Sequence, residues 1–273
     1  MVSVCMITYG HTNYICDAIE GVLAQNTDFD FELIIANDCS PDNSDEVIVK
    51  YLANNPRRNI VKYIRNVSNV GMQKNLAIAV NASSGKYIAI CEGDDYWIDS
   101  FKLHKQINYM EQNPMISFSF HGAKTLDNYG NYGIHYKHPK FFNKEIVPTK
   151  YFLEKAAASF CTASVIIKRE VVENLPKWFI EAHIGDYPLM FLALDKGEIG
   201  YLEDVMCVYR VNSIQGWSTK NMTIKGRIRN FKKMIQLNTI INEQTFGRYK
   251  KHLRLNLFSY ILNKFFVTMK SFL

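Results

Sequence analysis

The stretch GMQKNLAIAVNASSGKYIAICEGDDYW (residues 71–97) decides the fold, because a helix-like segment, a strand-like segment and a cluster of acids follow one another directly. Residues 71–83 have apolar side chains at helical spacing, and residues 86–91 form a short apolar run typical of a buried strand. Three carboxylates then stand within four positions: Glu92, Asp94 and Asp95. Because like charges this close repel one another, we expect them to bind a compensating ligand.

The same alternation runs through the first third of the chain. Strand-like runs at 2–8, 32–37, 60–65 and 86–91 alternate with helix-like segments at 13–25, 43–55 and 71–83. Near-continuous apolar strands separated by helices predict an α/β fold with a Rossmann-like, mostly parallel sheet flanked by helices. Ligands of such sheets bind beyond the carboxyl ends of the strands. The polar segments 8–11, 37–43, 65–71 and 92–96 should therefore share one edge of the sheet.

The pattern is less regular after residue 111. The sequence predicts strands at 115–123 and 161–168, a loop at 128–142, a helix at 185–197 opened by Gly-Asp, and one or two strands within 199–211. Two helices are expected beyond residue 220, at 222–241 and 246–270. We therefore expect one domain over residues 1–218, followed by a helical C-terminal extension over residues 219–273.

Composition excludes several classes of protein. A chain of 273 residues with 48% hydrophobic residues can bury one large core. No apolar run reaches the roughly 18 residues of a membrane-spanning helix, and the start at Met1 does not resemble a signal sequence, so the expected location is cytoplasmic. The six cysteines stand singly without a CxxC pair, which predicts reduced and mostly buried thiols.

The C-terminal extension differs from the rest of the chain in charge. Residues 220–273 contain 12 Lys or Arg and one acid, Glu243, whereas residues 1–219 contain 20 Lys or Arg and 25 Asp or Glu. Basic and apolar residues at helical spacing suit peripheral contact with an anionic membrane. Packing of residues 253–272 on the body, or on a second subunit of a homo-oligomer, is the alternative. No nucleic-acid-binding motif is present, so nucleic acid is not expected as a partner.

The acids after residue 91 suit a divalent cation. Mg²⁺ or Mn²⁺ typically takes one or two carboxylates and completes its shell with water and substrate phosphates. The alternative is that Asp94, Asp95 and Asp99 only cap the following helix. One helix start needs one cap, and this stretch supplies four acids, which favours a cation site for a substrate that carries a diphosphate.

Four segments of the chain together resemble the family 2 glycosyltransferases, enzymes of the GT-A fold. They are ITYGHTNYICDAIEGVLAQ (7–25), ELIIANDCSPDNSDEVI (32–48), NVGMQKNLAIAVNASSGKYIAICEGDDYW (69–97) and GDYPLMFLALDKGEIGYLEDVMCVYRV (185–211). They occur in the family's order and spacing and cover most of residues 1–212. The resemblance implies a nucleotide-sugar donor half at 1–110 and an acceptor half at 111–218.

The resemblance also implies roles for the clustered acids. EGDD corresponds to the family's metal-binding carboxylate motif. Asp95 would bind the divalent ion, Mn²⁺ or Mg²⁺, that bridges the phosphates of the donor. Asp94 would contact the ribose or support the metal. Glu92 stands where the family usually has Asp, and its longer side chain departs from that pattern.

Residues at three other strand ends correspond to the family's nucleotide-binding positions. Thr8 and Tyr9 match the Thr-Tyr pair that holds the base and ribose. Asp38 matches an Asp that accepts a hydrogen bond from a pyrimidine N–H, which favours uracil or thymine, although guanine also offers N–H donors. Gly71 would let the next loop approach the nucleotide. Lys74 stands where many relatives carry Arg, so it keeps the charge and loses the planar fork.

The resemblance places the catalytic base in the second half of the chain. Asp186 would deprotonate the acceptor hydroxyl in an inverting transfer, and capping of the helix that it opens is the alternative role. Arg210 would pair with phosphate or support Asp186. Trp217, in a segment that relatives use as a loop over the diphosphate, would contact donor or acceptor. Asn212 replaces a frequent His of that segment.

The predicted function is a metal-dependent transfer of a hexose or N-acetylhexosamine from a nucleoside diphosphate, UDP being favoured, to a saccharide or lipid-linked acceptor in surface-polysaccharide synthesis. A dehydrogenase or P-loop enzyme is disfavoured, because neither GxGxxG nor GxxxxGK[ST] occurs. The alternatives are a sugar-1-phosphate nucleotidyltransferase and a sugar-nucleotide-binding or scaffold subunit without catalytic activity.

Overall fold

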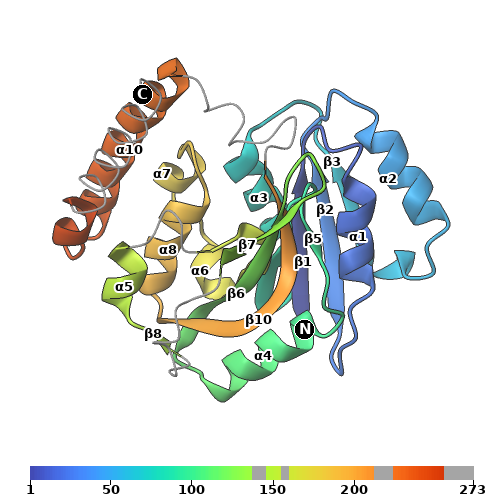
Figure 1. The fold of residues 1–273 in the computed structure, drawn as a ribbon, viewed down its shortest axis with the longest axis horizontal. Coiled ribbons are helices and arrows are strands. Elements are labelled where there is room, and N and C mark those ends of the chain that lie inside the picture. Colours follow the sequence, from blue (N-terminus) through green and yellow to red (C-terminus); the bar gives the residue numbers. More distant parts are fainter. Residues whose placement is uncertain (137–145, 155–159, 212–223, 255–273) are drawn as a thin grey trace.

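The alternation expected in the first third of the chain is present in the computed structural model, which describes residues 1–136, 146–154, 160–211 and 224–254 (Figure 1). The elements are β1 (Val2–Thr8), α1 (Ile15–Leu23), β2 (Phe31–Asn37), α2 (Ser44–Ala53), β3 (Val61–Arg65), α3 (Met72–Asn81) and β4 (Tyr87–Ile90). The four strands pair in parallel, with β1 between β2 and β4.

The second half of the chain extends the same sheet. Its elements are β5 (Tyr96–Trp97), α4 (Lys102–Gln112), β6 (Ile116–Leu126), β7 (Tyr132–Tyr136), β8 (Ile146–Val147), α5 (Thr149–Glu154), β9 (Ile166–Lys168), α6 (Arg169–Val172), α7 (Lys177–Ile180), α8 (Asp186–Leu194), β10 (Glu198–Arg210) and α10 (Ile224–Gln244). The strand order is β3-β2-β1-β4-β9-β6-β10-β5, with β7 and β8 paired to β6 and β10. The sheet is mixed, because β9 runs antiparallel to both β4 and β6.

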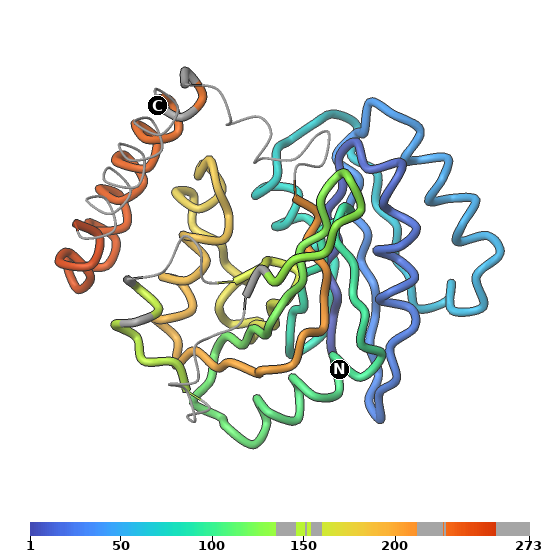
Figure 2. The backbone as a smooth tube through the Cα atoms, viewed as in Figure 1, coloured from blue at the N-terminus to red at the C-terminus, as the bar shows by residue number. Residues whose placement is uncertain are grey.

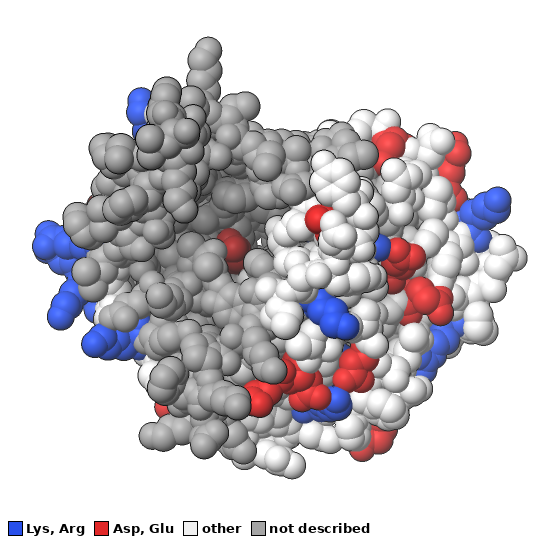
Figure 3. All heavy atoms as spheres, in the orientation of Figure 1, with Lys and Arg blue, Asp and Glu red and all other residues white. Residues whose placement is uncertain are grey.

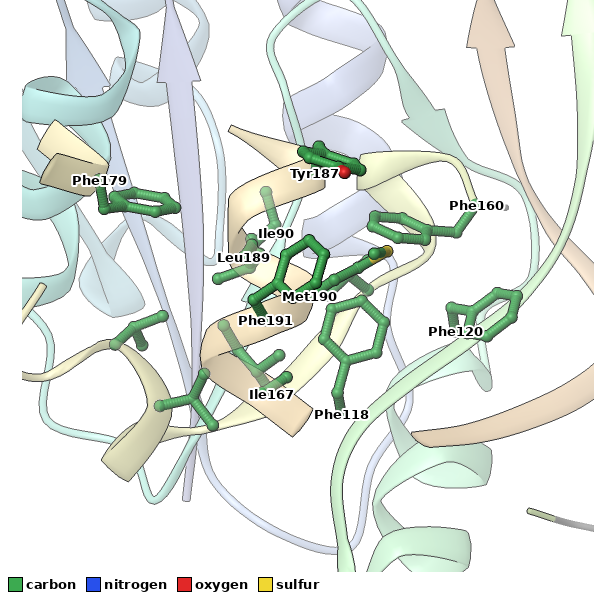
Figure 4. Close-up of a cluster of buried hydrophobic side chains, with 14 of the residues drawn as sticks. Ile90, Phe118, Phe120, Phe160, Ile167, Phe179, Tyr187, Leu189, Met190 and Phe191 are labelled. Atoms are coloured by element: carbon green, nitrogen blue, oxygen red, sulfur yellow. The ribbon is translucent and has the colours of Figure 1, made fainter. Parts of the chain in front are cut away.

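Two hydrophobic clusters lie on opposite faces of the sheet. One joins the sheet to α1, α2 and α4, and the other joins it to α3, α8 and α10. In the second cluster aromatic rings meet between β6 and α8 (Figure 4), where the centroids of Phe118 and Phe160 are 5.2 Å apart. Figure 2 shows the two halves of the chain side by side, with α10 at the outer edge of the second. This packing leaves the carboxyl ends of the parallel strands at one edge.

One sequence expectation in the second half of the chain needs correction. Part of the expected loop at 128–142 is the strand β7, which pairs antiparallel with the end of β6. The helix that the sequence analysis placed after the acids is α4, which buries only a narrow apolar stripe of Leu103, Ile107 and Met110. Residues 199–211, for which one or two strands were expected, fall in one long strand, β10, as the first of these options predicts.

The C-terminal extension packs on the body as far as the structure describes it. Met234, Leu237 and Ile241 of α10 are buried, as is Leu253. The Tyr187 hydroxyl donates a 2.8 Å hydrogen bond to Asn238 of α10. The expected helix at 246–270 is described only to residue 254, where residues 250–254 are helical. Its remainder lies outside the described residues.

Charge and cysteine placement follow the sequence analysis. Figure 3 shows Lys and Arg side chains gathered on the side of α10, whereas both signs are interspersed on the opposite side. All six cysteines are free thiols, four of them buried. None of the helices among the described residues is long and apolar enough to cross a membrane.

Candidate active site

The acids after β4 lie where β4 leaves the sheet, next to the end of β1. Gly93 donates its N–H to Ile7 at 3.0 Å. A Cβ at Gly93 would stand 2.7 Å from Oγ1 of Thr8, so only glycine lets this turn approach β1 so closely. Glu92 and Asp94 flank that glycine and are both partly exposed. The turn therefore holds two carboxylates at the ligand edge of the sheet.

Glu92 is largely buried beside other carboxylates of the cluster. Burial first, then the charges of Asp94 and Asp186, raise the pKa of Glu92 to about 8, against a hydrogen bond from Thr162 that lowers it. The influence of Asp186 is informative, because that residue opens α8 in the other half of the chain. The fold thus gathers acids from both halves at one place, with more negative charge than the surrounding residues neutralise.

Asp94 and Asp95 point in different directions. Asp95 is fully buried, where its Oδ1 accepts a 2.8 Å hydrogen bond from the backbone N–H of Arg210 and its Oδ2 lies 3.7 Å from the Cys161 thiol. Burial, Cys161 and the neighbouring acids raise the pKa of Asp95 well above its usual range. Asp94 is partly exposed, with its Oδ2 3.8 Å from Nε2 of His11. Of the pair, Asp94 is the one that a ligand can reach.

The helix-capping alternative for these acids applies only to Asp99. Its Oδ1 accepts the N–H of Phe101 at 2.8 Å, just before α4 begins. Neither Asp94 nor Asp95 caps that helix. A structural cap therefore does not account for the acids at 92–95.

The loop after β1 brings a residue that the sequence analysis did not single out. Thr8 is buried, and its Oγ1 lies 3.2 Å from Nδ1 of His11. The other ring nitrogen of His11 faces Asp94, so the imidazole joins the β1 loop to the acidic turn. Tyr9 is partly exposed between them. The only sequence signal for His11 was its position in the polar segment after the first strand.

Asp38 anchors the loop before α3. Its Oδ1 accepts hydrogen bonds from the Asn66 side chain at 2.9 Å and the Val70 N–H at 2.8 Å, and its Oδ2 accepts the Gly71 N–H at 2.9 Å. Asn66 also donates to Asn75 of α3. A carboxylate has about four acceptor sites, so this network leaves about one for a ligand.

The loop that Asp38 anchors places the start of α3 at the ligand edge of the sheet. Gly71 has φ +90°, a left-handed value that disfavours other residues, and a Cβ there would meet no atom within 4 Å. Lys74 is exposed on the first turn of α3. These positions agree with a loop that can approach a ligand, with a basic side chain beside it.

Asp186 is the first residue of α8 and is partly exposed. Its Oδ1 accepts the backbone N–H of Tyr187 at 2.8 Å. Burial raises the pKa of Asp186 above its usual value, which makes the carboxylate a stronger base. The N-cap of α8 is Gly185, without a side-chain cap hydrogen bond, so the Asp186 carboxylate bonds the first helical turn but does not cap it. The charge of Asp186 also acts on Glu92 in the acidic cluster.

Arg210 locks the acidic turn to α1. Its guanidinium donates a 2.8 Å hydrogen bond to the backbone carbonyl of Asp94 and forms a 2.5 Å ion pair with Asp17. It also stacks over the rings of Tyr96 and Tyr14, at 4.4 and 5.0 Å from their centroids. These bonds join it to the turn and not to Asp186. Trp217 and Asn212 lie outside the described residues.

The site fits a divalent metal bound mainly through its substrate. Among the described residues no group of three or more His, Cys, Asp or Glu is placed to hold a metal ion. Mg²⁺ and Mn²⁺ sites that bind diphosphates need only one or two carboxylates. Glu92 and Asp94 are hard oxygen ligands, and burial together with repulsion from Asp94 raises the pKa of Glu92. A bound cation would relieve that repulsion.

Comparison with known proteins finds a family model and named relatives that are glycosyltransferases. The sequence model of glycosyl transferase family 2 matches residues 3–175. An uncharacterized glycosyltransferase of Methanocaldococcus jannaschii is 31% identical over 77% of this chain and 71% of its own. The Escherichia coli enzyme WfaP, a UDP-Glc:alpha-D-GlcNAc-diphosphoundecaprenol beta-1,3-glucosyltransferase, is 27% identical over 72% of this chain and 71% of its own.

Other relatives are longer than the matched region. Uncharacterized proteins of Mycobacterium bovis and Mycobacterium tuberculosis are 29% identical over 79% of this chain, which spans only 60% of their length.

Solved structures share the fold at low sequence identity. A mannosyltransferase of Pyrobaculum calidifontis, solved with GDP-Man and Mn²⁺, has a TM-score of 0.65 at 16% identity, over 94% of this chain and 69% of its own. TarS of S. aureus, solved with UDP-GlcNAc, has a TM-score of 0.60 at 16% identity, over 91% of this chain and 72% of its own.

Proposed function

The chain belongs to glycosyl transferase family 2 and has the GT-A fold, and from this premise we propose that it transfers a sugar from a uridine diphosphate donor to a saccharide or lipid-linked saccharide acceptor. A role in surface-polysaccharide synthesis is supported by WfaP, whose name gives a UDP-sugar donor and a lipid-linked acceptor. The single observation that carries the proposal is the convergence of Glu92 and Asp94 with Asp186 at the ligand edge.

The donor occupies the edge formed by β1, β2 and β4. The loops after these strands carry Thr8 and Tyr9, the Asp38-anchored turn, and Asp94. Lys74 adds a positive charge near the start of α3, where a phosphate or ribose oxygen is favoured by the helix N-terminus as well. The remaining acceptor capacity of Asp38 suits a base N–H.

Asp94 is the residue that would hold the metal, Mn²⁺ or Mg²⁺. The buried Asp95 would support the turn that carries Asp94. A direct bond from Asp95 would require its carboxylate to leave the Arg210 N–H. When bound, the divalent ion supplies positive charge for the diphosphate of the leaving group. Arg210 contributes by fixing the backbone of Asp94 through its guanidinium, and it would act through that backbone and not through phosphate.

Asp186 acts as the general base. It accepts the proton of the acceptor hydroxyl while that oxygen attacks the anomeric carbon from the side opposite the diphosphate. The bond from the anomeric carbon to the diphosphate oxygen breaks, and the diphosphate leaves with the electron pair. One displacement inverts the anomeric configuration. The raised pKa of Asp186 favours proton uptake at this step.

Two variants of the same helix test the catalytic assignment. Asp186→Asn should lower transfer at least about a hundredfold, because general-base catalysis typically contributes that much. It should leave binding of the nucleotide sugar intact. Asp195→Asn is the matched control, because Asp195 ends α8 in an exposed ion pair with Arg248. Equal transfer by both variants would refute Asp186 as the base.

The metal requirement and the alternatives are tested with the wild-type protein. Purified protein is incubated with UDP-glucose, UDP-N-acetylglucosamine or GDP-mannose and Mn²⁺, with and without chelator, and transfer and hydrolysis are followed by release of nucleoside diphosphate. Release that stops with chelator supports the proposal. Binding without any release would indicate a subunit that lacks catalytic activity. Formation of a nucleotide sugar from a nucleoside triphosphate and a sugar-1-phosphate would indicate a nucleotidyltransferase.

A further inference from the structure

Gln73 has an unexplained side chain on the first turn of α3. The residue is 7% exposed, and its amide nitrogen Nε2 is buried with no hydrogen-bond partner among the residues that the structure describes. Leaving a buried donor unpaired destabilises a protein. Native structures contain few such groups, and one at a binding site indicates a ligand that pairs with it.

The position of this amide points to the catalytic half of the chain. A Cβ built on Gly185 would stand 3.9 Å from Nε2 of Gln73, the contact that such a Cβ makes with the described residues outside its own helix and chain neighbours. Gly185 is the N-cap of α8 and directly precedes Asp186. The amide of Gln73 therefore lies beside the base, between two helix N-termini that converge here, those of α3 and α8.

This place lies between donor and acceptor. On one side, α3 follows the loop that Asp38 anchors, which is part of the donor half. On the other side, Asp186 must face both the attacking hydroxyl and the anomeric carbon. The group that spans these two sides during the reaction is the transferred sugar itself.

We propose that Gln73 binds the transferred sugar and helps to select it. Its amide N–H would donate a hydrogen bond to a ring hydroxyl or to the carbonyl oxygen of an acetamido group. This inference rests on the proposed function and names one residue that selects the sugar. The amide nitrogen is a donor only, so its partner is an oxygen with a free lone pair. A site built to pair with such an oxygen discriminates against sugars that lack it, because the donor then stays buried and unpaired.

Glycine at position 185 is part of the same arrangement. Among the described residues outside its own helix and chain neighbours, a methyl group there would be in ordinary van der Waals contact with the amide. Gly185→Ala therefore fits this part of the fold and places a methyl group against Nε2 without changing Gln73. With glycine at this position no methyl group competes with a sugar oxygen for the place beside the buried amide.

The test compares nucleotides with and without the sugar. Dissociation constants for UDP, UDP-glucose and UDP-N-acetylglucosamine, and for GDP and GDP-mannose, are measured with Mn²⁺ by titration calorimetry. The proteins are wild type, Gln73→Met, Gly185→Ala and Gln112→Met, an exposed control. The quantity compared is the ratio of the constant for the nucleoside diphosphate to that for its sugar.

Gln73→Met should lower this ratio about three- to tenfold for the preferred sugar, which is the value of one hydrogen bond, while the constant for the free diphosphate stays within about twofold. Gly185→Ala should lower the ratio in the same direction, and Gln112→Met should not change it. Free Gln73→Met should melt at the wild-type temperature or above, since an unpaired buried donor has been removed.

Two results would overturn the inference. One is an unchanged ratio in Gln73→Met. The other is a lower melting temperature together with equal weakening for diphosphate and sugar, which would show that the amide only supports the fold. If the wild-type protein binds none of these nucleotides, the proposed function fails and this inference fails with it. If it binds them with an unchanged ratio in the variant, only this inference fails.

Discussion

Replacing Lys102 with methionine should stabilise the protein at neutral and acidic pH. Lys102 opens α4 and is fully buried. Its Nζ donates to Gln106 at 2.7 Å and lies 4.1 Å from the ring centroid of Trp97. Burial lowers the pKa of Lys102 from 10.5 to about 7, against the opposite effect of three neighbouring thiols.

The magnitude follows from that pKa. A fall from 10.5 to about 7 corresponds to about 5 kcal/mol of lost proton affinity in the folded state. Between these values the unfolded chain binds a proton that the folded chain does not, so the stability from this group rises with pH. Below about pH 7 the folded protein carries the full penalty. Methionine removes it, and the loss of a donor to Gln106 offsets about 1–3 kcal/mol, which leaves a net gain of about 2–4 kcal/mol.

Urea unfolding of wild type and Lys102→Met at pH 6, 7, 8 and 9 measures this difference. The stability gain of the variant should be largest at pH 6 and should shrink as pH rises. Lys105→Met is the matched control, because Lys105 is on the same helix and pairs at the surface with Asp99 and Asp204. That change should alter stability by less than about 1 kcal/mol. A Lys102→Met protein that is less stable than wild type by the same amount at every pH would refute the reasoning.

Three further outcomes are expected. Asp38→Ala leaves three N–H donors without their acceptor and should lower the free energy of unfolding by about 2–4 kcal/mol in urea titrations, and nucleotide affinity should fall with it. Arg210→Met should weaken metal-dependent nucleotide binding severalfold in calorimetry, because the backbone of Asp94 loses its anchor, and unchanged affinity would remove that role. Glu92→Gln should raise the melting temperature at pH 8.5, because the folded wild type must then ionise a carboxyl group whose pKa is about 8. Below about pH 4.5 Glu92 is protonated in both the folded and the unfolded wild type, so the melting temperatures of variant and wild type should coincide.

Local patterns in the sequence predicted much of the fold. Strands β1 to β4 and the helices between them follow from apolar runs and helical spacing, because both faces of this part of the sheet are covered. The strand β7 was not predictable in the same way. Its residues Tyr132 and Ile134 are exposed, so no buried face imposes an alternating pattern on the sequence.

The sequence could propose which residues form the candidate site, but not how their side chains are arranged. The sequence and the family resemblance selected Asp94, Asp95, Asp38 and Asp186, and the structure places all of them at one edge. It could not be predicted that Asp95 turns inward, because its partner is a backbone N–H that lies 115 residues away in the chain. The same holds for Asp38, whose carboxylate is bound by donors 28 to 33 residues away.

Residues that act through contacts between distant segments gave weaker signals. His11 joins Thr8 to Asp94 only because the loops after β1 and β4 end side by side. The buried, unpaired amide of Gln73 and its position beside Gly185 become visible only when the packing of α3 against α8 is known. Neither residue belongs to a motif that a sequence reveals by itself.

The most direct measurement of the central claim is the calorimetric titration of UDP into the protein with Mn²⁺, and again after chelation of the metal. The account predicts binding to the wild type that is lost or at least about tenfold weaker with chelator, and a similar loss in Asp94→Asn even with Mn²⁺ present. Asp99→Asn, whose carboxylate accepts the Phe101 N–H and pairs with Lys105, should bind as the wild type does. Equal affinity for UDP in all these conditions, or binding by Asp94→Asn that keeps its full dependence on Mn²⁺, would contradict the claim that the exposed acid after β4 holds a metal against a diphosphate.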